Sequence, residues 1–346
     1  VANLLDQLSG DVWERKSVLR CLIAALHHKK KAIPFINMLL KIEIDNTRES
    51  AVLFRSSTLV THCVEGYLNL LANELLQKVL KHHIEELYKD ETSLELNPMH
   101  LNGDEGKTER HAKRLGERVE AIWKDIADNF HLVPEPIQRI FEYIRLKVSE
   151  RWPDEPLAKY TGVTSFIFLR FFNSALTTPY SRLYGLAEQK PSDNTTRNLT
   201  LISKVMMSIA NFRKFGRKED FLMVMNPVVE KINDAMTSYI DQISDPTNIS
   251  TLSPERLSLI WEKYKTGETQ KVTVRGETME YPEAMAQVVG VIMKHLDKIN
   301  EMPVTPELTE LLEVVKPLQI VDKRSSKLDT KRVSGPSTPL TPLRSP

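Results

Sequence analysis

Apolar residues recur at helical spacing along most of the chain. Between Gly66 and Tyr88 this spacing predicts one long amphipathic helix, and residues 91–107, which break the pattern, predict a loop. Pro134 and Pro136 mark the start of a helix that runs to about residue 148. The other predicted helices cover about 109–130, 195–211, 219–224, 227–243, 283–299 and 306–315. The pattern therefore predicts an all-α fold.

Residues 162–176 differ from these helices because they are apolar on nearly every side. Such a segment is typical of a central helix that other helices surround. Arg170 is the one charge within it. Because an unpaired charge inside a protein is costly, Arg170 is expected to have partners or to reach a cleft.

The C-terminal third contains one predicted hairpin and a polar tail. Residues 270–281 alternate around Arg275-Gly276, which predicts two short strands. Residues 322–346 have six Lys or Arg against two Asp or Glu, with four Pro and eight Ser or Thr, and are expected to be disordered. Thr338, Thr341 and Ser345 each precede proline and are candidate phosphorylation sites.

The charge balance excludes some classes of protein. Lys plus Arg number 47 and Asp plus Glu 46, so a nucleic-acid binder that works through bulk charge is not expected. The two cysteines, Cys21 and Cys63, cannot form a disulfide framework and fit a reducing compartment. No run approaches 18 apolar residues, and a start at Val1 without Met is expected of an excised fragment.

Familiar ligand motifs are incomplete in this chain. Gly106-Lys107-Thr108 resembles the end of a phosphate-binding loop, but position 101 is leucine instead of the required glycine, so a surface loop is expected. The pairs His27-His28 and His82-His83 lack the HExxH spacing and are interpreted as solvated helix faces. No metal and no nucleotide of its own is therefore expected.

Three segments in order carry a family pattern: VLFRSSTL at 52–59, SFIFLRFFNSALTTP at 165–179, and LISKVMMSIANFRKFGRKEDFLMVMN at 201–226. Together they resemble the Ras GTPase-activating protein domain family, whose blocks read F-R-x-x-S/T-L, F-L-R-x-x-x-P-A-x-x-x-P and L-I-x-K…N…F-G-x-K-E…N. The third block is most similar to the synaptic-type subgroup. Ser174 stands where the family has proline, a change expected to straighten or loosen that turn of the helix.

The resemblance implies an elongated, all-helical domain that stimulates GTP hydrolysis by a Ras-family GTPase. Arg55 would be the arginine finger that neutralises charge on the departing phosphate. Arg170 would hold the loop that carries Arg55 by hydrogen bonds to its backbone. The chain would be an enzyme activator with no catalytic activity or cofactor of its own, because the GTPase holds GTP and Mg²⁺.

Further residues are expected to contact the GTPase by the same resemblance. Ser56 and Ser57 would allow close approach of the backbone, and Leu169 would line a groove. Thr58 and Asn211 have alternative interpretations, as caps of the helices beside them. The run from Arg213 to Lys218 would form one basic patch. The full set of expected GTPase contacts is Phe54, Ser56, Ser57, Thr58, Leu169, Asn211, Lys214, Arg217 and Lys218.

Several alternatives stay open at this level. A scaffold that binds the GTPase without stimulating it is the main rival, although relatives of that kind, such as the IQ-motif scaffold proteins, lack the finger arginine. The sequence does not choose between Ras and Rap. We expect a catalytic domain over 1–245, a helical extension over 246–321 and the tail over 322–346. The expected location is the cytoplasm, with recruitment to the inner face of the plasma membrane.

Overall fold

The computed structural model describes residues 19–24, 26–27, 29–101 and 104–245, and the backbone of residues 271–274 and 277–280. The predicted helices over 283–299 and 306–315 lie outside these residues, as do Thr338, Thr341 and Ser345. The α-helices are α3 (Ala32–Asn46), α4 (Leu59–Leu71), α5 (Asn73–Lys89), α6 (Pro98–Leu101), α7 (Glu105–Asp128), α8 (Glu135–Arg151), α9 (Ala158–Phe166), α10 (Asn173–Thr177), α11 (Asp193–Ala210) and α12 (Asn226–Ile243). The 3₁₀ segments are η1 (Ser50–Val52), η2 (Phe130–Leu132) and η4 (Arg217–Met225), and η3 (Ile167–Phe172) is π-helical.

Within the described residues the fold is all-α, as predicted, apart from one hairpin. Strands β1 (Lys271–Val274) and β2 (Glu277–Glu280) pair antiparallel, with Lys271 opposite Glu280, which confirms the predicted hairpin. None of the described helices is both long and apolar enough to cross a bilayer.

The prediction of a single helix from Gly66 to Tyr88 is wrong. The chain leaves the helical conformation at Ala72, with φ −110° and ψ 15°, so α4 ends at Leu71 and α5 begins at Asn73. The apolar period hides this break because Leu68 and Leu75 are both fully buried on either side of it.

The prediction of a loop over residues 91–107 is wrong at its C-terminal end. Helix α6 lies inside it, and Gly106-Lys107-Thr108 forms part of the first turn of α7 instead of a surface loop. The Asp104 side chain accepts a hydrogen bond from the Lys107 backbone N–H at 3.0 Å, which caps this helix. Gly106-Lys107-Thr108 therefore has a structural role, as the capped first turn of α7.

The continuous helical run from Ala158 to Thr177 lies at the centre of the core, as predicted. It consists of α9, η3 and α10, and α11 packs against all three parts of it. Phe168 lies 6.3 Å from the ring of Trp123 on α7 and 6.1 Å from that of Tyr239 on α12. Burial of each such side chain contributes about 1.5–3 kcal/mol, so this run joins helices from distant parts of the sequence.

The π-helical segment places one more residue in a turn than an α-helix would. Ser174 follows this segment, at the position where proline was expected. Its Oγ donates to the carbonyl of Leu169, five residues earlier, at 3.4 Å. The helix continues through Ser174 to Thr177. That the missing proline straightens or loosens this turn stays a prediction.

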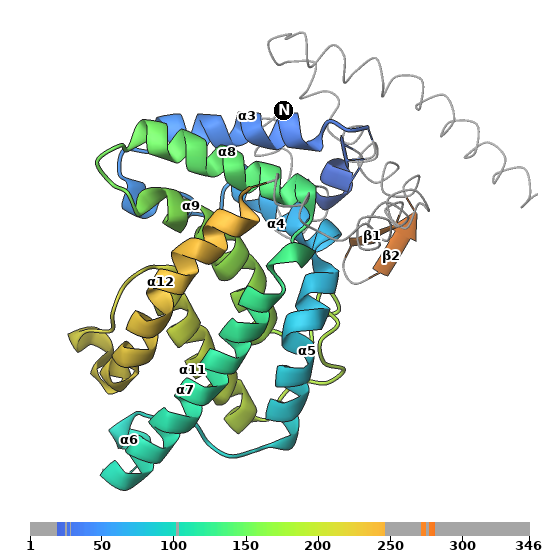
Figure 1. Cartoon of the computed structure of the whole chain (residues 1–346). Coiled ribbons are helices and arrows are strands. Elements are labelled where there is room, and N and C mark those ends of the chain that lie inside the picture. The colour runs from blue at the N-terminus through green and yellow to red at the C-terminus, as the bar shows by residue number, and fades with distance from the viewer. Residues whose placement is uncertain are drawn as a thin grey trace, which may run out of the picture. The chain divides into compact units, whose positions relative to one another are not determined.

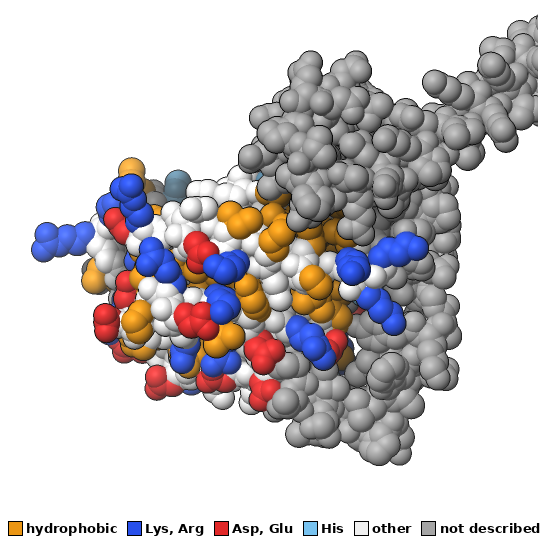
Figure 2. Space-filling model, turned by 90° about the horizontal axis from the view of Figure 1, so that it is seen from above, with side chains coloured by type: hydrophobic (Ala, Val, Ile, Leu, Met, Phe, Trp, Pro, Cys, Tyr) orange, Lys and Arg blue, Asp and Glu red, His pale blue; other side chains and the backbone are white. Residues whose placement is uncertain are grey.

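Elsewhere the helices pack in pairs. Figure 1 shows α3 beside α8 and α5 beside α7, and both pairs are in contact. On the face drawn in Figure 2, Lys and Arg side chains alternate with Asp and Glu, and apolar side chains lie between them. This face carries no continuous basic field, in keeping with the balanced composition.

Candidate functional site

Residues 53–58, here called the finger loop, connect η1 to α4. Phe54 has a positive φ of 56°, which costs a residue other than glycine about 1–3 kcal/mol. Its ring is 1% exposed and packs 4.9 Å from the ring of Phe166. The expectation that Phe54 contacts a GTPase is therefore wrong for this structure. Its burial instead anchors the loop and leaves the next residue, Arg55, exposed.

Arg170 joins the π-helical segment to the finger loop. Its Nη2 donates to the carbonyl of Ser56 at 3.0 Å, and its Nη1 donates to the carbonyl of Ser165 at 2.7 Å. The guanidinium also lies 5.8 Å from the centre of the Phe166 ring. The predicted partners of this charge, including the loop backbone, are thus confirmed. Burial lowers the pKa of Arg170, and the nearby charge of Glu65 opposes that shift.

Glu43, on α3, supports the finger loop from another direction, and sequence reasoning missed it. Its carboxylate accepts a hydrogen bond from Thr58 Oγ1 at 2.6 Å and another from the backbone of Phe54. Burial raises the pKa of Glu43, while the Thr58 hydroxyl and the charge of Arg170 act against this. Glu43 lies outside the three family blocks, so no motif pointed to it.

Thr58 caps α4, which was the alternative interpretation of this residue. It forms a reciprocal capping box with Thr61, in which each side chain bonds the backbone of the other residue. Ser56 and Ser57 are both exposed, and Ser57 Oγ lies 2.8 Å from His62 Nε2. The loop thus presents small side chains around Arg55 while its end is fixed to a helix.

Arg55 lies in a hollow of about 590 Å³ between the finger loop and the end of α11. Its Nη2 donates to Asn211 Oδ1 at 2.6 Å. Asn211 is also the C-terminal cap of α11, as its alternative interpretation held. Partial burial, and then the charge of Arg213, lowers the pKa of Arg55. The bond between Arg55 and Asn211 joins two family blocks, and sequence reasoning did not predict it.

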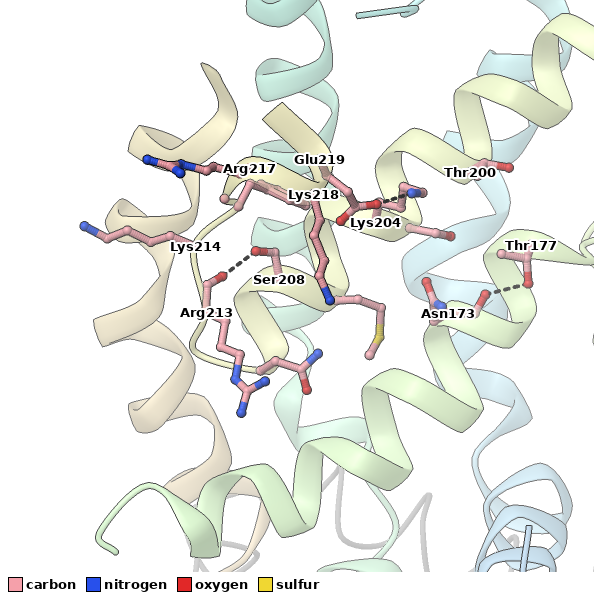
Figure 3. Close-up of a pocket in the computed structure, with 15 residues that line it drawn as sticks. Asn173, Thr177, Thr200, Lys204, Ser208, Arg213, Lys214, Arg217, Lys218 and Glu219 are labelled. Carbon is pink, nitrogen blue, oxygen red and sulfur yellow. Dashed lines mark hydrogen bonds and ion pairs between the residues drawn. The ribbon is translucent and has the colours of Figure 1, made fainter. Parts of the chain in front are cut away.

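A second hollow, of about 630 Å³, shares Asn211 and Arg213 with the first. Lys218 points into it, whereas Lys214 and Arg217 point away from it (Figure 3). Lys214 forms an ion pair with Glu230 on α12. The expectation that residues 213–218 form one basic patch is therefore wrong, because their side chains diverge.

The chain direction after α11 explains this divergence. Phe212 adopts a positive φ of 53°, and Phe215 is buried, with its backbone bonded to the Asn226 side chain at 2.8 and 3.1 Å. This turn separates the basic side chains on either side of Phe215. Leu169, expected to line a groove, is partly exposed on the π-helical segment.

The interpretation of the histidine pairs as solvated helix faces is wrong for His83, which is 6% exposed. His82 and His83 both contact Asp125 on α7. His27, from the other pair, bonds the hydroxyl of Tyr67 at 2.8 Å. Asp125 lies more than 40 positions from the histidines, so the spacing gave no signal of this cluster.

Residues 35–211 match the family model described as GTPase-activator protein for Ras-like GTPase. A probable Ras GTPase-activating-like protein, ngap, of Dictyostelium discoideum is 32% identical over 66% of this chain and 26% of its own length. The Ras GTPase-activating protein gap-2 of Caenorhabditis elegans is 31% identical over 70% of this chain and 20% of its own. Human Ras GTPase-activating protein nGAP is 30% identical over 68% of this chain and 20% of its own. The chain thus spans about a quarter or less of these relatives.

Proposed function

Because the chain belongs to the family of GTPase-activator proteins for Ras-like GTPases, we propose that it stimulates GTP hydrolysis by such a GTPase through Arg55. The observation that carries this proposal is the placement of Arg55. It is exposed at a loop whose neighbouring residues are fixed by Phe54, Glu43 and Arg170. Such fixing reduces the entropy lost when a side chain must be positioned precisely.

The chemistry follows from what a Ras-like GTPase lacks. It holds GTP and Mg²⁺ itself, so the proposal assigns no cofactor to this chain. As the γ-phosphate departs, negative charge develops that a guanidinium can neutralise with two parallel N–H donors. Arg55 Nη2 donates to a neutral amide in this structure and can exchange that partner for phosphate oxygens.

The surroundings of Arg55 fit a large partner. Asn211 and Arg213 line both hollows, so the two lie next to each other, and the first also includes Arg55 of the finger loop. Lys218 points into the second hollow, and the structure records no ion pair for Arg213 or Lys218 within the described residues. We propose that these two cations face the acidic switch regions of the GTPase, which would increase the rate of association.

The test is single-turnover GTP hydrolysis by a panel of Ras and Rap proteins, with wild type, Arg55→Ala and Arg55→Lys. A finger supplied in trans contributes about 10³- to 10⁵-fold, a range for which Ras with its activator is the reference case. We expect Arg55→Ala to lose most of this stimulation and still bind the GTP-loaded GTPase. If wild type binds but stimulates no GTPase, the chain is a binding scaffold and the proposal is wrong.

A further inference from the structure

We propose that His82, His83 and Asp125 form a binding site for a divalent transition-metal ion, with Zn²⁺ as the ion that fits best. His82 Nε2 lies 2.9 Å and His83 Nε2 2.8 Å from the same oxygen, Asp125 Oδ2. All three candidate ligand atoms lie within 4.8 Å of one another. This cluster is separate from the finger loop and does not depend on the proposed function.

The fold builds the site from two helices. His82 and His83 are consecutive on α5, and Asp125 lies in the last turns of α7, which runs beside α5 (Figure 1). The two rings lie 3.9 Å apart between centroids. The His83 side chain is 7% exposed, whereas that of His82 is 48% and that of Asp125 is 32% exposed. An ion can therefore enter from the solvent side and keep a water as its fourth ligand.

The distances suit zinc after a small adjustment. Bonds of about 2.1 Å in tetrahedral geometry place neighbouring ligand atoms about 3.4 Å apart. The two contacts with Asp125 Oδ2, at 2.8 and 2.9 Å, would have to lengthen by only about 0.5 Å each. Two imidazoles and one carboxylate favour zinc over the hard ions Mg²⁺ and Ca²⁺, which prefer oxygen ligands alone.

The hydrogen bonds of the cluster are compatible with a metal. Two ring nitrogens that share one carboxylate oxygen each need a hydrogen on Nε2 to bond it. An ion takes the place of these two hydrogens, and a neutral ring then carries its proton on Nδ1.

Other charged groups around the cluster have partners of their own. Glu86, one turn further along α5, is paired with Arg118 of α7, which also contacts Asp90. Lys124, beside Asp125, is paired with Asp128 at 2.5 Å. These pairs leave Asp125 as the acidic group that faces both histidines.

Isothermal titration of ZnCl₂ into the untagged full chain at pH 7 tests the site. We expect one equivalent to bind with a micromolar dissociation constant. His82→Ala and Asp125→Asn should each weaken binding at least about tenfold, because each removes one of three ligands. The matched control His100→Ala, at an exposed histidine of α6, should bind as wild type does.

Cobalt binding gives a second, spectroscopic measurement that is independent of calorimetry. Co²⁺ added to wild type should produce the visible absorption bands of a four-coordinate ion, and His82→Ala should lack them. Circular dichroism checks that the variants fold, which we expect because His82 is half-exposed. Absence of stoichiometric zinc binding by wild type, or an affinity of His82→Ala within twofold of wild type, would show that the cluster is only hydrogen-bonded.

Discussion

Arg170 offers a direct way to measure how firmly the finger loop is held. Replacing it with Met keeps a long apolar stem over Phe166 and removes both guanidinium bonds, to Ser56 and to Ser165. Lys at this position keeps the charge but has no planar fork with which to reach two carbonyls. The pair Arg170→Met and Arg170→Lys thus separates charge from geometry.

The size of the effect can be worked from these contacts. Of the two guanidinium bonds, only the one to Ser56 joins the π-helical segment to the finger loop. A charged hydrogen bond of this kind contributes about 1.5–3 kcal/mol. The Ser56 carbonyl also accepts from Thr61 Oγ1 at 3.2 Å, so it does not lose every partner and the low end of this range applies. About 1.5–2 kcal/mol corresponds to a rate of stimulated hydrolysis about 10- to 30-fold lower for Arg170→Met. Arg170→Lys should lose less.

The assay is single-turnover phosphate release at saturating activator, with the double variant Arg55→Ala, Arg170→Met as the control. Because Arg170 acts through Arg55, the second substitution should add almost nothing once Arg55 is gone. Two results refute this reasoning. One is a rate for Arg170→Met within twofold of wild type in a folded protein, and the other is a full additional loss in the double variant.

Two further predictions concern the other contacts of the loop. Asn211→Asp places a carboxylate against Arg55 and should slow stimulated hydrolysis about fivefold, because a partly exposed ion pair of up to about 1 kcal/mol must first break; an equal or faster rate would contradict this. Burial raises the pKa of Glu43 from its usual 4.5, so between the unfolded and folded pKa values the folded state binds more protons than the unfolded state. The free energy of unfolding of wild type should therefore fall relative to that of Glu43→Gln as pH rises from 4.5, in urea titrations. A difference that does not change with pH would be inconsistent with a raised pKa.

Much of the fold could be predicted from the sequence, because helical periodicity and burial have the same physical cause. The helices over 109–130 and 227–243 were predicted to within four residues at each end. The central helical run could be predicted because its phenylalanines leave no polar face. That Arg170 has hydrogen-bond partners could be predicted because an unpaired buried charge is costly.

The remaining features depend on tertiary contacts that no local pattern records. The break at Ala72 preserves the apolar period, and the burial of Phe54 requires a backbone conformation that phenylalanine rarely adopts. Glu43 and Asp125 act on residues that come from other helices, so neither has a spacing signal. The divergence of Lys214 and Lys218 follows from the turn at Phe212, where sequence alone shows only a run of charge.

The π-helical segment also has a consequence for changes in chain length. A residue added to an α-helix rotates everything after it by about 100°, but a π turn absorbs the extra residue locally. Deleting one residue between Ile167 and Leu169 is therefore expected to close the bulge, and the helix beyond it would keep its orientation in the core. The carbonyl of Ser165 would then lie four positions from the arginine instead of five. A deletion between Ile167 and Leu169 would thus move Arg170 relative to the finger loop, while the helix beyond it keeps its place in the core.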